Sequence, residues 1–465
     1  MDKKVLIIGE SKINHDITVF FTQKECRLVY VDDVYAIRAL DGQVGDFTLR
    51  TKHTTELADF VIVSEQPCAP PVIADSLAMF SVYDSAKELA AASSADKSSP
   101  IVFLLDYISE SPLSATIQAL RSSIQLAQVK RKVFYLSKFI RTGGKNVEQL
   151  YRQAREMGVT FIKYESLNIK TDNVNETFSF AASDGVIETL ITSHIVFSDG
   201  SNEVGERFSH VTKSLNLTTT ELGFLSEDRF FLTPVLTSRR GVYHITRNLA
   251  AEDLEYALNL VYSHASNPNE LPSAFGKAIV NGEKCVLCYN CHRACTHAAL
   301  TPDSDSRHMH VLNRACNACG TCVAICPGSA IELEFKPYSS DKSGKTNKAL
   351  ILCCENSAAD AVDKALTMLS NRAADIEAVT VPCGGIVDVD YLTTALLSYH
   401  KIMAAICIDD ACRHFNGSYR ACKQVSLAHE ILSKAGLPTS RLHIAKVSPT
   451  MPIMFKDNIV SMLDE

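Results

Sequence analysis

The stretches CVLCYNCHRACT, residues 285–296, and CNACGTCVAICP, residues 316–327, contain eight cysteines in two copies of the spacing C-x2-C-x2-C-x3-C. Of the sixteen cysteines in the chain, fourteen lie between Cys285 and Cys422. The apolar run at the N-terminus is too short for a signal-peptide core, and no apolar stretch reaches the about 20 residues of a membrane span, so we expect a soluble, cytoplasmic protein. Because thiols stay reduced in that compartment, the cysteines indicate metal binding or catalysis rather than disulfides.

This doubled spacing resembles that of bacterial two-cluster ferredoxins. In that family, two-residue spacers let three thiolates converge on one iron-sulfur cube, and the fourth cysteine, at the start of the next helix, reaches the other cube. The resemblance implies two [4Fe-4S] clusters, one bound by Cys285, Cys288, Cys291 and Cys326 and the other by Cys316, Cys319, Cys322 and Cys295. Pro327 follows the last cysteine as the pattern asks, whereas Thr296 replaces the corresponding proline of the first copy.

Structural zinc is the alternative, because zinc also binds paired C-x2-C cysteines. A zinc ion takes four ligands, so zinc would leave four of the eight thiols unused or need two irregular sites. The repeated three-plus-one spacing therefore favours iron-sulfur clusters. His292 and His297 lie close to the cysteine loops, and we expect them to be solvated or to surround the ligands rather than to bind metal.

Two polar linkers rich in proline, serine and glycine, at 266–273 and 336–347, divide the chain. We name the resulting parts the N-terminal block (1–265), the cysteine-rich block (274–336) and the C-terminal block (348–465). A length of 465 residues fits about three domains. The net charge of −7 provides no basic surface, which argues against a nucleic-acid partner or an anionic membrane surface.

The N-terminal block alternates short β-branched and apolar runs with longer helix-compatible segments, which predicts parallel βαβ units of the nucleotide-binding, Rossmann type. The predicted strands are 3–9, 26–33, 59–64, 100–106, 132–137 and 159–164. A dinucleotide-binding fold needs several glycines after the first strand, so that the backbone can approach the pyrophosphate. Gly9 is the only one in IIGESKINHD, so the fold is predicted to be degenerate.

The C-terminal block has the same alternation on a smaller scale, with predicted strands at 349–353, 376–383, 402–408 and 442–447, which indicates a parallel sheet. Cysteines stand at the ends of three of these strands, and the carboxyl ends of parallel strands meet at one edge. We therefore predict a third metal centre, and the candidate ligands are Cys353, Cys354, Cys383, Cys407 and Cys412. The alternative is that these thiols are small buried hydrophobic residues, the role expected for Cys26, Cys68 and Cys422.

The C-terminal block resembles the delta subunit of methyl-viologen-reducing hydrogenase in ILCCENSAAD (351–360), VPCGGIVD (381–388) and CIDDACRHFNGSYRA (407–421). That resemblance implies a [2Fe-2S] cluster on Cys383, Cys407, Cys412 and either Cys354 or Cys353. The adjacent pair replaces the C-x2-C of the family, so the fourth ligand stays open. Arg413 displaces His414 from the position directly after the last cysteine.

The first two blocks resemble the flavoprotein subunit of heterodisulfide reductase, which carries ferredoxin-like inserts, most clearly over 132–166. The flavoprotein motif T-x-x-x-G-V-[FY] recurs as TSRRGVY at 237–243, without the second glycine and the aspartate that follow it in the family. These departures favour a flavoprotein scaffold that has lost its FAD. The fusion is similar to the B subunit of quinone-interacting oxidoreductase complexes and to relatives in soluble electron-bifurcating assemblies.

The patterns together predict an iron-sulfur electron-transfer subunit whose chemistry takes place in partner subunits, because no catalytic triad or acid-base pair stands out. The resemblance implies a partner that is a flavoprotein, a hydrogenase, a formate dehydrogenase or an NADH-oxidising module. A flavoenzyme with its own FAD in the N-terminal block is the alternative function. A redox sensor is a third possibility, which no basic DNA-binding helix supports.

Overall fold

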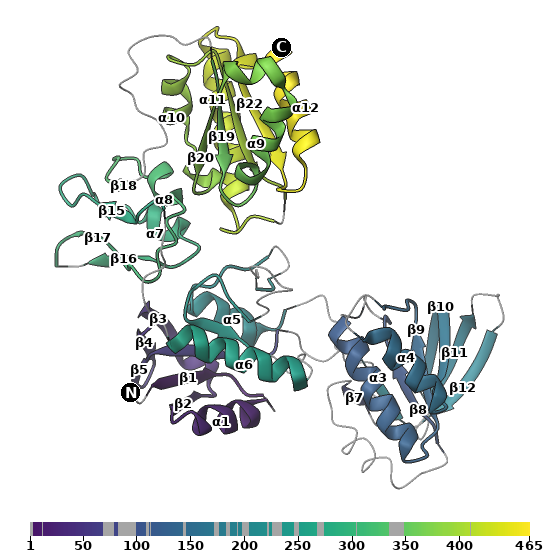
Figure 1. The fold of residues 1–465 in the computed structure, drawn as a ribbon. Coiled ribbons are helices and arrows are strands. Elements are labelled where there is room, and N and C mark those ends of the chain that lie inside the picture. The colour runs from purple at the N-terminus through teal and green to yellow at the C-terminus, as the bar shows by residue number, and fades with distance from the viewer. Residues whose placement is uncertain are drawn as a thin grey trace.

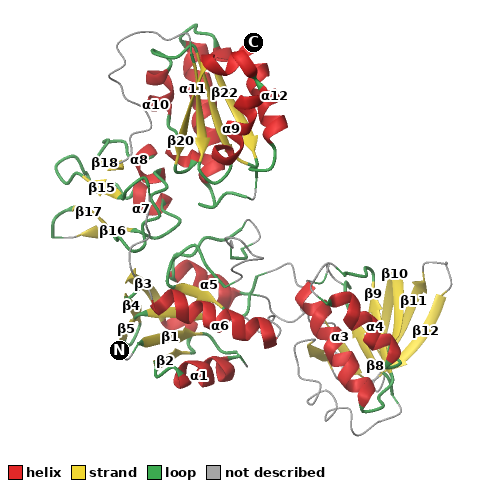
Figure 2. Cartoon of the chain, viewed as in Figure 1, coloured by secondary structure: helices red, strands yellow, loops and turns green. Residues whose placement is uncertain are grey.

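The computed structural model describes most of the chain, which folds into α/β domains with parallel sheets and a smaller cysteine-rich part with short antiparallel pairs (Figures 1 and 2). The described residues are 3–11, 13–67, 79–81, 99–107, 111, 113–142, 146–171, 176–182, 187–192, 194–197, 204–220, 223–225, 235–245, 251–266, 274–303, 305–333, 348–409 and 411–465. Among them, no helix combines the length and the apolar character that a membrane crossing requires.

The first sheet of the N-terminal block has the order β14-β6-β1-β2, all parallel. Its strands are β1 (Lys4–Ile8), β2 (Arg27–Val31), β6 (Phe60–Val63) and β14 (Val242–His244). Successive side chains of a strand point to opposite faces. Val5 and Ile7 therefore pack with α1 (Asn14–Gln23) and α6 (Ala251–Ser266), while Leu6 and Ile8 pack on the other face with α5 (Glu206–Ser214).

The segment between β2 and β6 differs from the predicted helix. After a short 3-10 turn, η1 (Val34–Ala36), it forms an antiparallel sheet of β3 (Ile37–Gln43), β4 (Asp46–Thr51) and β5 (Thr55–Ala58). Buried Phe47 and Leu49 alternate in β4 with more exposed residues, which is the period of a half-buried strand. The βαβ prediction was wrong here because it used only the flanking strands.

A second sheet completes the N-terminal block and has the order β12-β11-β10-β9-β8-β13-β7. The parallel part consists of β7 (Met79–Ser81), β8 (Ile101–Leu104), β9 (Val133–Ser137), β13 (His194–Phe197) and the first residues of β10 (Thr160–Thr171). β11 (Glu176–Ala182) and β12 (Ile187–Thr192) extend it in antiparallel fashion, and the helices α3 (Leu113–Gln128) and α4 (Val147–Glu156) accompany it. The sequence patterns predicted β8, β9 and the start of β10, but not the other strands of this sheet or the division of the block between two sheets.

The cysteine-rich block consists of two short antiparallel pairs and two short helices. β15 (Ala278–Val280) pairs with β18 (Ile331–Leu333), and β16 (Leu300–Asp303) pairs with β17 (His308–Val311). The helices α7 (Asn290–Ala294) and α8 (Thr321–Ala324) carry Cys291 and Cys322, the third cysteine of each copy of the motif. The two halves of the block thus repeat one another in structure as well as in sequence.

The C-terminal block is a four-stranded parallel sheet of order β20-β19-β21-β22, as predicted. Its strands are β19 (Ala349–Cys354), β20 (Ile376–Val381), β21 (Lys401–Cys407) and β22 (Leu442–Val447). Its helices are α9 (Ala358–Met368), α10 (Val389–Ala395), α11 (Gly417–Lys434) and α12 (Pro452–Asp464), with 3-10 turns η2 (Ser370–Asp375), η3 (Gly384–Ile386) and η4 (Thr439–Arg441).

One hydrophobic core extends through both the cysteine-rich block and the C-terminal block. It combines Cys291, Cys316 and Met309 with residues of the C-terminal sheet such as Leu350, and with Ile386 of η3. α9 and α12 cover the opposite face of that sheet and form a separate core. The two cysteine-bearing blocks are therefore packed against one another.

Candidate metal centres

Four thiols of the C-terminal block meet at the carboxyl edge of its sheet. Cys354 is the last residue of β19, Cys407 is the last residue of β21, and Cys383 lies two residues beyond β20. The Sγ atoms of Cys354 and Cys407 are 3.6 Å apart. Cys383 and Cys407 each form hydrogen bonds with both Cys354 and Cys412. The four sulfurs thus form a closed ring, which we name the four-thiol ring.

The structure distinguishes the two adjacent cysteines that the sequence left open. Because neighbouring residues of a strand face opposite sides, Cys353 points away from the ring. It is fully buried in the core beneath α9 and α12, and its thiol donates to the carbonyl of Ile351 at 3.9 Å. Of the pair, the structure brings only Cys354 to the other three thiols.

Backbone and amide donors surround the four-thiol ring. Gly385 N–H donates to Cys383 Sγ at 3.4 Å, and Asn356 Nδ2 donates to Cys407 Sγ at 3.8 Å. Gly417, the first residue of α11, leaves space for two of the sulfurs, because a β-carbon there would overlap Cys383 Sγ and lie 3.2 Å from Cys412 Sγ. Sequence reasoning missed Gly417, although the Asn-Gly pair just before a predicted helix was a signal for a close approach.

The protons of the ring are distributed unevenly. Hydrogen bonds from Cys383 and Cys407 lower the pKa of Cys354 to about 3, while the hydrogen bond with Cys354 raises the pKa of Cys383. Four sulfurs in contact in a buried site suit a cation that replaces these protons. Four cysteine thiolates are the ligand set of a [2Fe-2S] cluster, so the residues present fit that group.

The eight cysteines of the cysteine-rich block fall into the two predicted groups. Cys291 interacts electrostatically with Cys326, Cys285 and Cys288, which we name the first cradle. Cys295 and Cys322 interact with Cys319 and Cys316, which form the second cradle. Burial, followed by the charge of Cys319, raises the pKa of Cys295 to about 12. Each cradle thus takes its fourth thiol from the other copy of the motif.

The backbone of the two cradles repeats at equivalent positions. In each copy of the motif, the residues before and after the second cysteine have left-handed backbone conformations, and so does the residue three positions after the fourth cysteine. The six residues have φ between 47° and 78°: Leu287, Tyr289, Ala298, Ala318, Gly320 and Ser329. Ala299 N–H donates to Cys295 Sγ at 3.3 Å, and Ala330 N–H donates to Cys326 Sγ at 3.2 Å. Such turns direct backbone N–H groups toward bound anionic groups, including iron-sulfur clusters.

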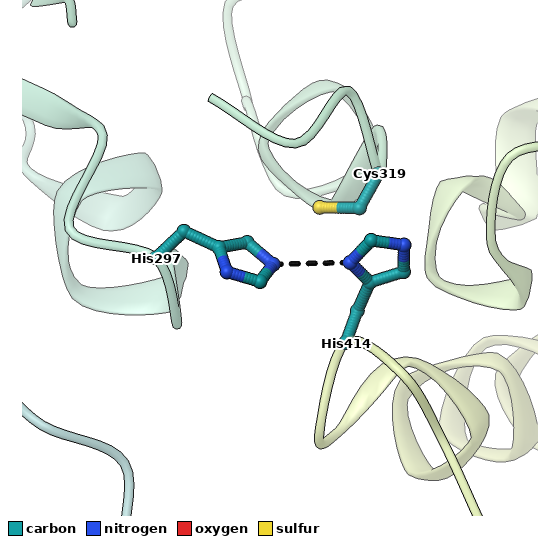
Figure 3. A group of neighbouring side chains, drawn as sticks. All are labelled: His297, Cys319 and His414. Carbon is teal, nitrogen blue, oxygen red and sulfur yellow. Dashed lines mark hydrogen bonds between the residues drawn. The ribbon is translucent and has the colours of Figure 1, made fainter. Parts of the chain in front are cut away.

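The second cradle lies against the four-thiol ring. The charge of Cys412 contributes to raising the pKa of Cys319, after the larger effect of burial. A β-carbon on Gly385, beside the ring, would lie 2.6 Å from Oγ1 of Thr321 in α8. His297 of the cysteine-rich block and His414 of the C-terminal block form a hydrogen bond with one another at 3.0 Å, and Cys319 lies beside the two rings (Figure 3). The first cradle is nearer to solvent, since Cys288 is exposed.

In the N-terminal block, an ion pair occupies the crevice where a Rossmann sheet binds the phosphates of a dinucleotide. Arg207 of α5 donates to the carboxylate of Glu65 from Nε at 3.0 Å and from Nη2 at 3.1 Å, and Nη2 also donates to the carbonyl of Asp32. Glu65 follows β6 and Asp32 follows β2, the two strands that flank β1. The ion pair therefore lies across the carboxyl end of β1.

The space beside Gly9 is also taken, because a β-carbon at Gly9 would lie 2.6 Å from the backbone nitrogen of Glu65. In the second sheet, the buried carboxylate of Asp106 follows β8. It accepts hydrogen bonds from Lys138 N–H, Phe139 N–H and Arg141 Nη1 at 2.9–3.2 Å. Both crevices thus contain an acid paired with an arginine, and these residues do not fit the phosphates of a bound dinucleotide.

Of the remaining cysteines that the structure describes, Cys26 and Cys422 are not grouped with the thiols of these sites. Cys26 packs at the edge of the first core of the N-terminal block, and Cys422 is half-buried on α11. Cys68 lies outside the described residues. His292, the other histidine near the cysteine loops, bonds through Nδ1 to the carbonyl of Leu300 at 2.6 Å.

Two family models match parts of the chain. Residues 349–465 match the family described as methyl-viologen-reducing hydrogenase, delta subunit, and residues 277–327 match the family described as 4Fe-4S dicluster domain. The resemblance of the C-terminal block to the hydrogenase delta subunit is thereby confirmed, and the chain contains an iron-sulfur domain. Both matches support an iron-sulfur electron-transfer role in a hydrogenase-like or reductase-like setting. The likeness of the first two blocks to the flavoprotein of heterodisulfide reductase stays a prediction.

A search of curated proteins finds no match. Among solved structures, the chain is similar to thioredoxin reductase of T. acidophilum, with 12% identity over 57% of this chain and 98% of that one, and a TM-score of 0.37. It is also similar to thioredoxin reductase of Lactococcus lactis, with 10% identity over 57% of this chain and 99% of that one, and a TM-score of 0.36. A flavoprotein disulfide reductase of Escherichia coli is similar at 9% identity, over 57% of this chain and 70% of that one, with a TM-score of 0.35. Likeness at these scores carries no argument about ligands.

Proposed function

We propose that this protein is the electron-relay subunit of a larger redox complex of the hydrogenase or heterodisulfide-reductase type. Two [4Fe-4S] clusters would occupy the two cradles, and one [2Fe-2S] cluster would occupy the four-thiol ring on Cys354, Cys383, Cys407 and Cys412. The observation that carries the proposal is the contact between the second cradle and the four-thiol ring, through Cys319, Thr321 and Gly385. Two centres in such contact, with the first cradle in the same block as the second, favour a path for electrons over isolated structural sites.

The clusters would supply one-electron transfer, and the residues of this chain hold and tune them. Burial of Cys322 and Cys383 limits the access of water, and N–H donors such as Gly385 and Ala299 stabilise the charge on sulfur. The exposed Cys288 places the first cradle at the surface, close in sequence to Val286, which is 75% exposed. This face would dock the redox centre of a flavoprotein, hydrogenase, formate dehydrogenase or NADH-oxidising partner.

Metal analysis of the full chain tests the proposal. Protein purified without oxygen is expected to be brown and to contain about 10 irons per chain, from two four-iron clusters and one two-iron cluster. Iron and zinc are measured by mass spectrometry, with acid-labile sulfide measured in parallel. Folded protein that contains zinc, or no metal after anaerobic reconstitution, would contradict the proposal.

The flavoenzyme alternative makes an opposite prediction, and the ion pairs disfavour it. The Glu65 carboxylate stands where a dinucleotide's phosphates would lie, and like charges so close repel. We therefore expect far less than one FAD per chain when acid-released flavin is measured by its absorbance and fluorescence. Stoichiometric FAD in the same preparation would favour the flavoenzyme over the simple relay.

A further inference from the structure

His297 and His414 are buried and meet where all three blocks touch. His297 follows the last cysteine of the first motif by two residues, and His414 follows Cys412 by two residues. Their side chains are within hydrogen-bond distance, His297 Nε2 to His414 Nδ1 at 3.0 Å, with the rings almost perpendicular (Figure 3). His297 Nδ1 also lies 3.0 Å from the carbonyl of Ser238 in the N-terminal block.

His297 Nδ1 faces two groups of opposite hydrogen-bonding character. The carbonyl of Ser238 lies 3.0 Å away and accepts, whereas the side-chain amide nitrogen of Asn317 lies 2.8 Å away and donates. The hydrogen bond between His297 Nε2 and His414 Nδ1 is therefore compatible with either direction. The two rings and the Ser238 carbonyl link the C-terminal block through the cysteine-rich block to the N-terminal block.

Two departures from the family patterns meet at the same place. Thr296, which replaces a proline of the ferredoxin pattern, has its Oγ1 within 3.4 Å of the carbonyl of His414 and donates to it. His414 is the residue that Arg413 displaces from its usual position in the hydrogenase pattern. Both side chains therefore serve a contact between blocks, which neither family pattern contains.

We propose that the hydrogen bond between His297 and His414 is a positioning contact that holds the second cradle and the four-thiol ring at a fixed separation for electron transfer. The ring nitrogens of His297 and His414 and the sulfur of Cys319 all lie within 4.8 Å of one another, so the imidazole pair lies beside a sulfur of the second cradle. The loop that carries His414 also carries Cys412. Loss of the bond would let this loop shift relative to Cys319. This inference rests on the proposed electron-relay function.

The test compares two removals of the same bond with two conservative replacements in the full chain. His297→Leu and His414→Leu each remove one partner of the hydrogen bond. His297→Gln places an amide group near the position of Nε2, and His414→Asn places one near that of Nδ1; an amide both donates and accepts, so each replacement can restore the bond in either direction. His292→Leu is the matched control, because His292 bonds within its own block. Each protein is reduced without oxygen, and the spin–spin splitting of its EPR signals is recorded with its iron content.

We expect all five variants to retain about 10 irons per chain. Both leucine variants at the pair should lose the splitting between the second [4Fe-4S] cluster and the [2Fe-2S] cluster. Their transfer of electrons between these centres should slow, because the rate of electron transfer falls as the separation of donor and acceptor grows. The conservative replacements His297→Gln and His414→Asn should restore both readouts, and His292→Leu should leave them unchanged.

Full iron content with unchanged splitting in both leucine variants would overturn the inference and leave the relay function intact. Loss of one zinc per chain in His297→Leu would also overturn it, because the three residues would then be a zinc site. Absence of iron in the unsubstituted protein would refute the relay function itself. The two failures are therefore distinguishable by iron analysis of the parent chain.

Discussion

Cys354→Ala is expected to remove the [2Fe-2S] cluster and to lower the iron content from about 10 to about 8 per chain, since only the four-thiol ring loses a ligand. Cys353→Ala is expected to retain all three clusters. The two residues are neighbours in β19 and have the same side chain, but they face opposite sides of the sheet. Iron content and the EPR signal of the two-iron centre measure the difference.

Cys353→Ala is the control for Cys354→Ala, because it separates loss of a ligand from a general loss of stability in β19. Cys353→Ala removes a buried sulfur from the core of α9 and α12, so we expect it to lower the free energy of unfolding by about 1 kcal/mol without loss of iron. Equal iron loss in both variants would show that iron content depends on the stability of β19 rather than on the ring. Loss in Cys353→Ala alone would reverse the assignment.

Gly417→Ala is expected to remove the same centre without changing any ligand. The added β-carbon would overlap Cys383 Sγ, a position that cannot give way while the sulfur keeps its place in the ring. Alanine favours helices by about 1 kcal/mol over glycine, so α11 itself should not be weakened. The variant should therefore contain about 8 irons per chain and lack the two-iron EPR signal.

Tyr419→Ala provides the control for this variant, because Tyr419 lies in the first turn of the same helix and its side chain is 64% exposed. It should retain about 10 irons per chain. A Gly417→Ala protein with a full complement of iron and an unaltered two-iron signal would mean that the cluster site is wider than the structure indicates.

Sequence patterns predicted the C-terminal sheet well because each of its strands is a short apolar run between helix signals. The convergence of Cys354, Cys383 and Cys407 followed from the parallel order alone. The choice between Cys353 and Cys354 could not follow, because a strand buried on both faces has no polar alternation to indicate its orientation.

Contacts between residues far apart in the chain also could not be predicted from the sequence. Arg207 and Glu65 are 142 residues apart, and nothing near either residue predicts their ion pair. His297 was expected to be solvated or to surround the ligands, and it is buried because it meets His414 across 117 residues. The final helix α12 was not predicted, although Pro452 stands at its start, where proline favours a helix.

The core that the cysteine-rich and C-terminal blocks share bears on the order in which the protein is made. A ribosome completes the cysteine-rich block first, and its apolar partners around Leu350 and Ile386 emerge only later. Until then the nascent second cradle lacks the wall that the finished molecule supplies. Insertion of its metal is therefore expected to follow the emergence and folding of the C-terminal block.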